Sequence, residues 1–267
     1  ARCYGLTSLG AIAPGYQADF VVLDNLSDMN VLEVYHRGKK IIKDEKVEIR
    51  PCDPQLKNTV HLLGFRESDL CLPWRGGKVH ILKMLEGQIV TEDFQEEVGY
   101  TEEKGRKVFK PDGTYQKIAA VERHKNTGKI GVGIVKGFGL RGGAIASSVS
   151  HDSHNLIVIG DNDHDMYLAV QELLRTQGGY TLVENGQVFD TLPLPIMGLM
   201  SDAGYEKVNE KLARMIPKAH EMGIPEGFDP FITLSFMALP VIPEIRITPR
   251  GVYLTQEDRM IQSPFDR

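Results

Sequence analysis

The residues best suited to chemistry lie together in one short segment: His151, Asp152, Ser153, His154 and Asn155. This polar segment follows the apolar run 144–149 and precedes the apolar run 156–159. Polar groups placed between core strands are costly unless each one finds a hydrogen-bond partner. Imidazoles and carboxylates can transfer protons near neutral pH and can hydrogen-bond the ring nitrogens of a heterocycle. The segment therefore indicates a site that recognises or hydrolyses a nucleobase.

The same segment has a second interpretation, which its spacing leaves open. It also fits a polar turn in which the Asp152 and Asn155 side chains accept hydrogen bonds from neighbouring backbone amides. Under the first interpretation, four residues are candidates for enclosing a substrate or handling its protons: His151, Asp152, His154 and Asn155.

The histidine spacing does not predict a complete metal site. His151 and His154 are three residues apart, but a turn does not give them a common ligand face, and the other histidines are scattered. The H-x-H, H-E-x-x-H and H-x-E with P-C-x-x-C patterns are absent from the sequence. The acidic stretch 161–165 lacks the glycine and the closing glutamate of a calcium loop, so we interpret it as the start of a helix.

Four glycines surround the end of an expected strand, at positions 131, 133, 137 and 139. They lack both the G-x-G-x-x-G spacing and the following helix of a dinucleotide-binding loop. We interpret them as relaxing a strand turn or allowing a close backbone approach.

The elements that must position the polar segment are both strands and helices. Apolar runs bounded by glycines and charged turns predict strands. These are expected at 20–23, 30–42 (a pair turning at Arg37-Gly38), 79–89, 115–122, 129–135, 144–149, 156–159, a hairpin over 180–190, and near 245 and 252. Helical spacing predicts one helix from Asp163 to Gly178-Gly179, a second after Ser201-Asp202, and a short third over 230–237. Pro217 is expected to kink or end the second helix.

Composition narrows the class of protein. The 267 residues are 42% hydrophobic and 25% charged, with a net charge of −5, as in a soluble globular protein. The longest basic cluster (Arg37, Lys39, Lys40) is short, which argues against a nucleic-acid partner, and no apolar run approaches the roughly 20 residues of a membrane span. Three scattered cysteines without C-x-x-C spacing predict neither disulfides nor a thiolate zinc site, so a cytoplasmic location is expected.

Two sets of residues resemble known families. Gly5-Leu6, 9–15 (LGAIAPG) and 18–24 (ADFVVLD) resemble the segment that closes amidohydrolase-superfamily enzymes after their barrel, where it joins a small β-sandwich. The second set is more specific and resembles the adenine deaminase C-terminal domain: 137–139 (GFG), 143–148 (GAIASS), 150–155 (SHDSHN) and 193–201 (PLPIMGLMS).

We therefore expect an α+β fold, a mixed β-sheet domain with packed helices over 56–267. A C-terminal stub of the amidohydrolase composite β-sandwich is expected to precede it over 1–55. The boundary is placed near residue 55 because the stretch 43–57 is charged and contains two prolines. Since the first residue is Ala1 and not Met, an incomplete chain is expected, although removal of the Met or a cloning choice would look the same.

The resemblance implies the C-terminal part of a hydrolase that converts adenine and water to hypoxanthine and ammonia, in purine metabolism and nucleobase salvage. The family uses Mn or Fe held by histidines and carboxylates of a (β/α)₈ barrel. Those ligands are expected upstream of Ala1, so none is assigned here and the chain alone is expected to be inactive. The expected partners are adenine and the missing barrel, with a homo-oligomer left open. The alternative is a non-catalytic module that binds a purine or mediates oligomerisation.

Overall fold

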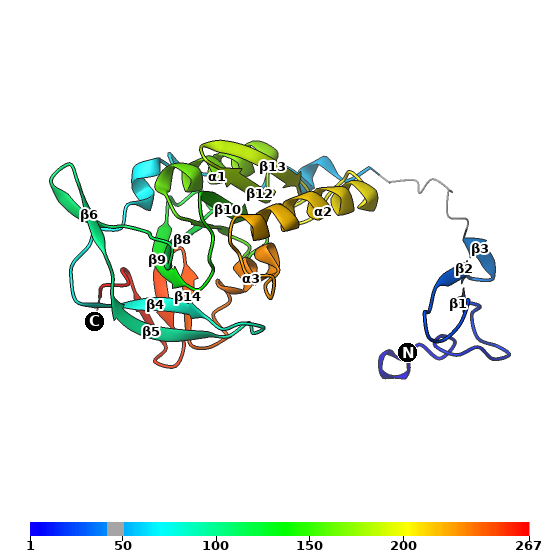
Figure 1. The fold of residues 1–267 in the computed structure, drawn as a ribbon. Coiled ribbons are helices and arrows are strands. Elements are labelled where there is room, and N and C mark those ends of the chain that lie inside the picture. The colour runs from blue at the N-terminus through cyan, green and yellow to red at the C-terminus, as the bar shows by residue number, and fades with distance from the viewer. Residues whose placement is uncertain (42–50, 267) are drawn as a thin grey trace. The chain divides into compact units, whose positions relative to one another are not determined.

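A computed structural model describes residues 1–41 and 51–266 of the protein, and the chain divides into two compact units (Figure 1). Unit 1 is Ala1–Arg50 and unit 2 is Pro51–Arg267. Two sequence-based expectations fall partly outside the described residues: the end of the strand pair at Ile42 and the first part of the connection 43–57.

Unit 1 is a small antiparallel sheet with the strand order β1-β2-β3. Its elements are η1 (Arg2–Tyr4), β1 (Phe20–Leu23), β2 (Val31–His36) and β3 (Lys39–Ile41). These bounds confirm the predicted strand at 20–23 and the pair that turns at Arg37-Gly38. The rings of Phe20 and Tyr35 stack 4.6 Å apart across β1 and β2. The sheet leaves large apolar side chains uncovered within its own unit, because Val21 is 52% exposed and Leu32 is 64% exposed.

Unit 2 is built on an eight-stranded mixed sheet with the order β13-β12-β10-β11-β8-β9-β4-β5. All of its neighbouring strands are antiparallel except β4 and β9, which are parallel. Its strands are β4 (Lys78–Met84), β5 (Thr91–Glu97), β8 (Tyr115–Val121), β9 (Ile130–Lys136), β10 (Gly143–Ser147), β11 (Leu156–Gly160), β12 (Gly179–Glu184) and β13 (Gln187–Pro193). Smaller sheets are formed by β6 (Tyr100–Glu103) with β7 (Arg106–Phe109), and by β14 (Ile245–Thr248), β15 (Gly251–Leu254) and β16 (Arg259–Ile261).

The central strands are apolar throughout because both faces of the sheet are buried. In β8, Ile118 and Ala120 belong to one hydrophobic core, while Ala119 and Val121 belong to the core on the opposite face. This follows from the alternation of side chains along a strand. The predicted strands at 115–122, 129–135, 144–149 and 156–159 are thereby confirmed, as is the hairpin around Asn185-Gly186.

Three α-helices cover the two faces of this sheet (Figure 1). They are α1 (Asp163–Thr176), α2 (Tyr205–Glu221) and α3 (Pro230–Phe236), with 3₁₀ turns at η2 (Pro54–Leu56) and η3 (Glu67–Leu70). Helix α1 packs on one face, while α2, α3 and the β14-β15-β16 sheet contribute to the core on the other face. Asn162 caps α1 by accepting a hydrogen bond from the Asp165 amide at 2.8 Å, which confirms the helix-start interpretation of 161–165.

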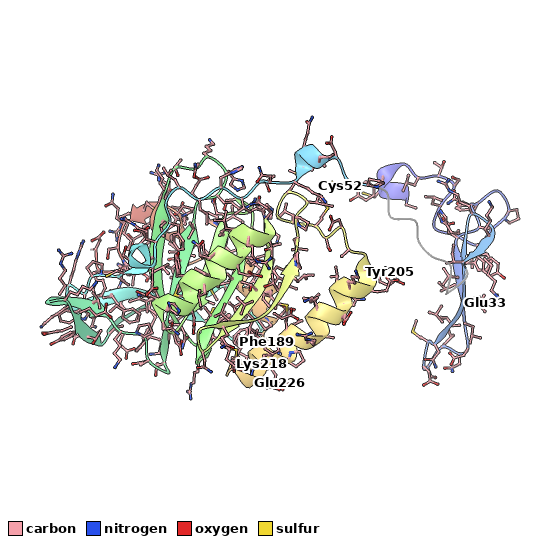
Figure 2. The ribbon with its side chains drawn as sticks, turned by 90° about the horizontal axis from the view of Figure 1, so that it is seen from above. Glu33, Cys52, Phe189, Tyr205, Lys218 and Glu226 are labelled. Carbon is pink, nitrogen blue, oxygen red and sulfur yellow. The ribbon has the colours of Figure 1, made fainter. Side chains whose placement is uncertain are left out.

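Helix α2 is fixed mainly by its second half, where Met215 and Ala219 are fully buried. Lys218 lies over the ring of Phe189 at 5.5 Å, and Figure 2 shows the two side chains beside each other, with Tyr205 at the far end of the helix. Pro217 does not end α2, which continues to Glu221. Pro217 has no amide hydrogen, so the helix lacks one intrahelical hydrogen bond at this position. The helix continues because Met215 and Ala219, two residues before and after Pro217, are buried in the core.

Four strands were not predicted: β5, β6, β7 and β16. The sequence of β5, TEDFQEE, carries four carboxylates and has no apolar alternation. Its charges are met by neighbours in the folded sheet, since Lys83 pairs with Glu92 at 2.8 Å and Lys136 pairs with Glu96 at 2.7 Å. The predicted strand at 79–89 is accordingly shorter and ends at Met84, where the turn into β5 begins.

Two of the four glycines around β9, Gly131 and Gly139, allow close backbone approaches, as predicted. A Cβ atom on Gly131 would lie 2.0 Å from the Thr248 carbonyl oxygen, and one on Gly139 would lie 2.5 Å from the Gly223 carbonyl oxygen. Gly131 therefore lets the β14-β15 turn press against the main sheet.

We expect Gly131→Ala to lower the free energy of unfolding by about 1–3 kcal/mol or more, because the added methyl group must displace backbone atoms of the adjoining turn. Gly99→Ala is the matched control, since a Cβ at Gly99 meets no atom within 4 Å. Urea denaturation of both variants measures the difference. Equal midpoints would show that the close backbone approach at Gly131 does not constrain the stability of the fold.

Candidate functional site

The polar segment forms the connection between β10 and β11, at one end of two central antiparallel strands. We call residues 150–155 the 150s loop. The His151 amide donates a hydrogen bond to the Ser235 carbonyl on α3 at 3.1 Å. Its ring stacks on Phe236 with centroids 4.8 Å apart and meets the His154 ring edge-on at 5.6 Å. The structure thus brings both histidines together beside α3.

Two of the four candidate residues are accessible at this end of the sheet. The side chain of His151 is 36% exposed and that of Asp152 is 84% exposed. The Asp152 carboxylate lies 3.8 Å from His151 Nδ1, so protonation of this imidazole would create an ion pair. An exposed imidazole next to a carboxylate is able to exchange protons with a bound molecule.

The other two candidates are tied into the protein. Asn155 is buried, and its Oδ1 accepts a hydrogen bond from the Arg123 backbone amide at 3.3 Å. His154 has a positive φ of 49° and donates its amide hydrogen to the Ser150 carbonyl at 2.5 Å. The Ser150 amide in turn donates to His154 Nδ1 at 3.3 Å. Asn155 therefore shapes the loop, while the ring of His154 stays partly accessible.

Arg123 holds the loop in place and was missed by the sequence analysis. Its side chain is 1% exposed, and its Nε donates to the His154 carbonyl at 2.5 Å. Nη1 donates to the carbonyl and hydroxyl oxygens of Thr59 at 3.0 and 3.1 Å, and Nη2 donates to the Met197 carbonyl at 2.9 Å. Burial lowers the pKa of Arg123 to about 10, so the guanidinium remains charged at neutral pH.

The electrostatics around His154 favour a neutral imidazole. Burial lowers the pKa of His154, and the neighbouring His151 and Arg123 lower it further, whereas Asp152 acts in the opposite direction. A neutral imidazole carries one donor and one acceptor nitrogen. Since Nδ1 accepts the Ser150 amide, the proton resides on Nε2.

Three of the segments that carried the adenine deaminase resemblance, 143–148, 150–155 and 193–201, meet at this site. Ser148 donates its hydroxyl to the Gly198 carbonyl at 2.6 Å and accepts the Gly179 amide at 2.7 Å. A Cβ atom on Gly198 would lie 2.9 Å from Arg123 Nη1, and its φ is 72°. The segment 193–201 thus needs glycine at position 198 because the guanidinium packs directly against the backbone there.

The Mn or Fe implied by the resemblance does not fit the described residues. Within 1–41 and 51–266, no group of three or more His, Cys, Asp or Glu side chains is placed to hold a metal ion. The loop itself offers hydrogen bonding and proton exchange through its imidazoles and carboxylate. All three cysteines are free thiols. None of the helices in the described part of the chain has the length and apolar character needed to cross a bilayer.

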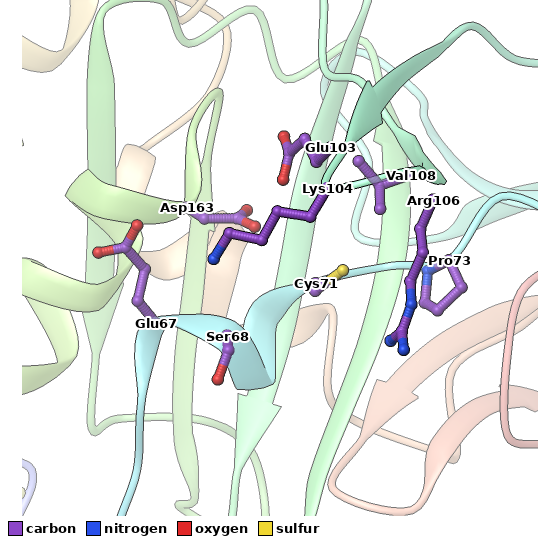
Figure 3. A pocket seen from close by; sticks show the side chains of 9 residues that line it. All are labelled: Glu67, Ser68, Cys71, Pro73, Glu103, Lys104, Arg106, Val108 and Asp163. Atoms are coloured by element: carbon purple, nitrogen blue, oxygen red, sulfur yellow. The ribbon is translucent and has the colours of Figure 1, made fainter.

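A separate hollow of about 830 Å³ lies between η3, the β6-β7 hairpin and the start of α1 (Figure 3). Its lining carries both signs of charge: Glu67, Glu103, Lys104, Arg106 and Asp163. Asp163 pairs with the buried Lys117, and Glu67 lies 3.1 Å from His164 Nδ1. None of the four candidate residues lines this hollow, so it is distinct from the 150s loop.

Comparison with known proteins defines the class of this α+β domain. A family model described as "Adenine deaminase C-terminal domain" matches residues 88–259. The chain therefore belongs to the adenine deaminase C-terminal domain family, which confirms the family resemblance seen in the sequence.

Three similar proteins carry the name adenine deaminase. The chain is 52% identical to the one from Desulfitobacterium hafniense (strain Y51) over 262 residues, which is 98% of this chain and 45% of that protein. It is 42% identical to the one from Nitratidesulfovibrio vulgaris (strain DP4) over 257 residues, with 95% and 44% covered. It is also 42% identical to the one from Petrotoga mobilis over 262 residues, with 95% and 45% covered. The chain thus spans less than half the length of these relatives.

The turn that follows β8 also contacts the loop and is built on Glu122. The Glu122 carboxylate accepts hydrogen bonds from the amides of His124, Lys125 and Thr127 at 2.6, 2.7 and 2.9 Å. His124 Nε2 then contacts the Ser153 carbonyl at 2.7 Å. Burial raises the pKa of Glu122, but these hydrogen bonds outweigh it and lower the pKa from 4.5 to about 2.

We expect the contribution of Glu122 to stability to be fully present above about pH 4.5 and to be lost as the pH falls toward 2, because its pKa is lower in the folded state. Glu122→Gln should lower Tm at pH 7, and the difference from the wild type should shrink toward pH 2. Glu226→Gln, at an exposed surface position, is the control. A Tm difference for Glu122→Gln that does not change with pH would refute this role of the carboxylate.

Proposed function

We propose that the chain is the C-terminal part of an adenine deaminase, which converts adenine and water to hypoxanthine and ammonia. The observation that carries this proposal is the 42–52% identity to adenine deaminases over 95–98% of the chain. Because the chain spans less than half of those proteins, the activity is proposed for the intact enzyme. Its metal, Mn or Fe, would be held by histidines and carboxylates of a barrel upstream of Ala1, and its location would be the cytoplasm.

In this proposal, residues 1–55 are the C-terminal stub of the amidohydrolase composite β-sandwich, and 56–267 are the adenine deaminase C-terminal domain. The apolar side chains that unit 1 exposes support the first assignment. Val21 on β1 and Val34 on β2 are register partners on the same face of the sheet and are 52% and 37% exposed, and a second layer of sheet would bury them.

The 150s loop would face the mouth of the barrel and help to enclose adenine. His151 and Asp152 suit this role because they are accessible and adjacent, so they offer one imidazole and one carboxylate to a bound base. The His154 ring would add a hydrogen bond, whereas Asn155 acts on the loop itself. Deamination at a purine carbon moves protons between water, ring nitrogen and leaving amine, which groups of this kind assist.

A second candidate function is a non-catalytic module that binds a purine or mediates oligomerisation. The lack of any three-ligand metal group among the described side chains is compatible with this function as well as with the first, which places the metal ligands upstream of this chain. Calorimetric titration of the chain with adenine and hypoxanthine, together with its mass in solution, discriminates the two functions. Tight metal-free purine binding would favour the module, whereas absence of binding and self-association through exposed apolar side chains would favour a severed enzyme part.

In a full-length protein that carries this chain, we expect His151→Ala and His154→Ala each to lower kcat/KM for adenine by about 100-fold, the lower end of the range typical of lost proton-handling groups. His164→Ala is the matched control, because its imidazole pairs with Glu67 on the charged hollow. Steady-state release of ammonia measures the effect. Unchanged kcat and KM in both variants would remove the loop from the substrate site.

We also expect the 267-residue chain alone, supplied with Mn or Fe, to release no ammonia from adenine. Activation of water by a metal needs a set of fixed protein ligands, and the described residues do not provide one. An ammonia assay at high protein concentration is the measurement, with a full-length family member as the positive control. Turnover by the chain alone would contradict the proposal that the barrel supplies the metal site.

A further inference from the structure

Arg123 is a buried cation whose hydrogen-bond acceptors in the described chain are carbonyl and hydroxyl oxygens. It joins three segments far apart in sequence, through Thr59, His154 and Met197. A guanidinium presents several donors in a rigid plane, so one side chain can satisfy all three segments at once. A lysine ammonium is a compact point charge and could not span the same set of acceptors.

The bond to the His154 carbonyl is the shortest of these contacts, at 2.5 Å. It acts on a residue whose φ is positive and whose amide is already bound to Ser150. With the backbone fixed on both sides, the imidazole keeps Nδ1 toward the Ser150 amide at 3.3 Å. The second ring nitrogen, Nε2, then carries the proton.

We propose that Arg123 is a positioning residue, which fixes the backbone of His154 so that its neutral imidazole presents Nε2–H as a hydrogen-bond donor to the substrate. This inference rests on the proposed function of the 150s loop. The ligand chemistry that fits is an acceptor atom on a planar heterocycle, such as a purine ring nitrogen.

The charges that face His154 are consistent with a neutral donor. His151, Arg123 and His124 disfavour protonation, and Asp152 favours it. Burial is the largest cause of the lowered pKa of His154. Loosening the loop admits water, which raises this pKa toward the ordinary histidine value.

Arg246 provides a matched control for the experiment. Its side chain is 0% exposed and, like Arg123, it is bound to uncharged oxygens: Thr91 Oγ1 at 2.6 Å and the carbonyls of Ile89 at 3.0 Å and Pro243 at 2.8 Å. Burial lowers the pKa of Arg246 to about 10, as it does for Arg123. It lies under the β4-β5 turn and contacts no residue of the 150s loop.

The test compares Arg123→Lys with Arg246→Lys in a full-length protein that carries this chain. Both variants should lower Tm. Arg123→Lys alone should lower kcat/KM for adenine at least 10-fold and move the acidic limb of the pH–rate profile to higher pH. His154→Gln, which keeps an N–H donor near the position of Nε2, should retain more activity than His154→Leu.

Two results would overturn the positioning role while the proposed function stands. The first is wild-type kinetics for Arg123→Lys when His154→Leu is impaired. The second is an equal loss of kcat/KM in Arg123→Lys and Arg246→Lys. Wild-type kinetics for His154→Leu would remove the donor role, and with it this inference. If Arg123→Lys does not fold, Thr59→Val removes only the Oγ1 contact at 3.1 Å. It should then give the same kinetic change to a smaller degree, and wild-type values would count against the proposal.

Discussion

The geometry of the candidate site depends on one buried charge, the guanidinium of Arg123. A charge removed from water is costly unless its donors are satisfied, and here they are satisfied by oxygens of Thr59, His154 and Met197. Hydrogen bonds to a charged group contribute more than neutral ones, about 1.5–3 kcal/mol each. Because the buried guanidinium needs these hydrogen bonds, the three segments that supply them are fixed around it.

This constraint explains several features that otherwise look unrelated. Gly198 has no side chain because the guanidinium occupies that space, and Ser148 ties the Gly198 carbonyl to the end of β10. The turn built on Glu122 adds a contact from His124 to the 150s loop. A polar loop between two apolar strands is thus held without a metal or a disulfide among the described residues, and its exposed groups, His151 and Asp152, are left available.

Much of the fold could be predicted from local patterns, but the support of the site could not. Strands such as β8 and β11 are apolar on both faces and bounded by polar turns, so they were predicted almost to the residue. Strand β5 carries charges whose partners are known only after the sheet has formed. Arg123 lies between Glu122 and His124, so it has the sequence context of a solvated turn. Its burial depends on Thr59 and Met197, which are 64 and 74 residues away in the chain.

The central claim is that the 150s loop, fixed by Arg123, lies against the substrate of an adenine deaminase. The most direct measurement is a crystal structure of a full-length protein carrying this chain with hypoxanthine bound. The account predicts His154 Nε2 or a ring nitrogen of His151 within about 3.2 Å of a purine acceptor or donor atom. A bound purine with the 150s loop more than about 8 Å away, beyond the reach of a bridging water, would contradict it.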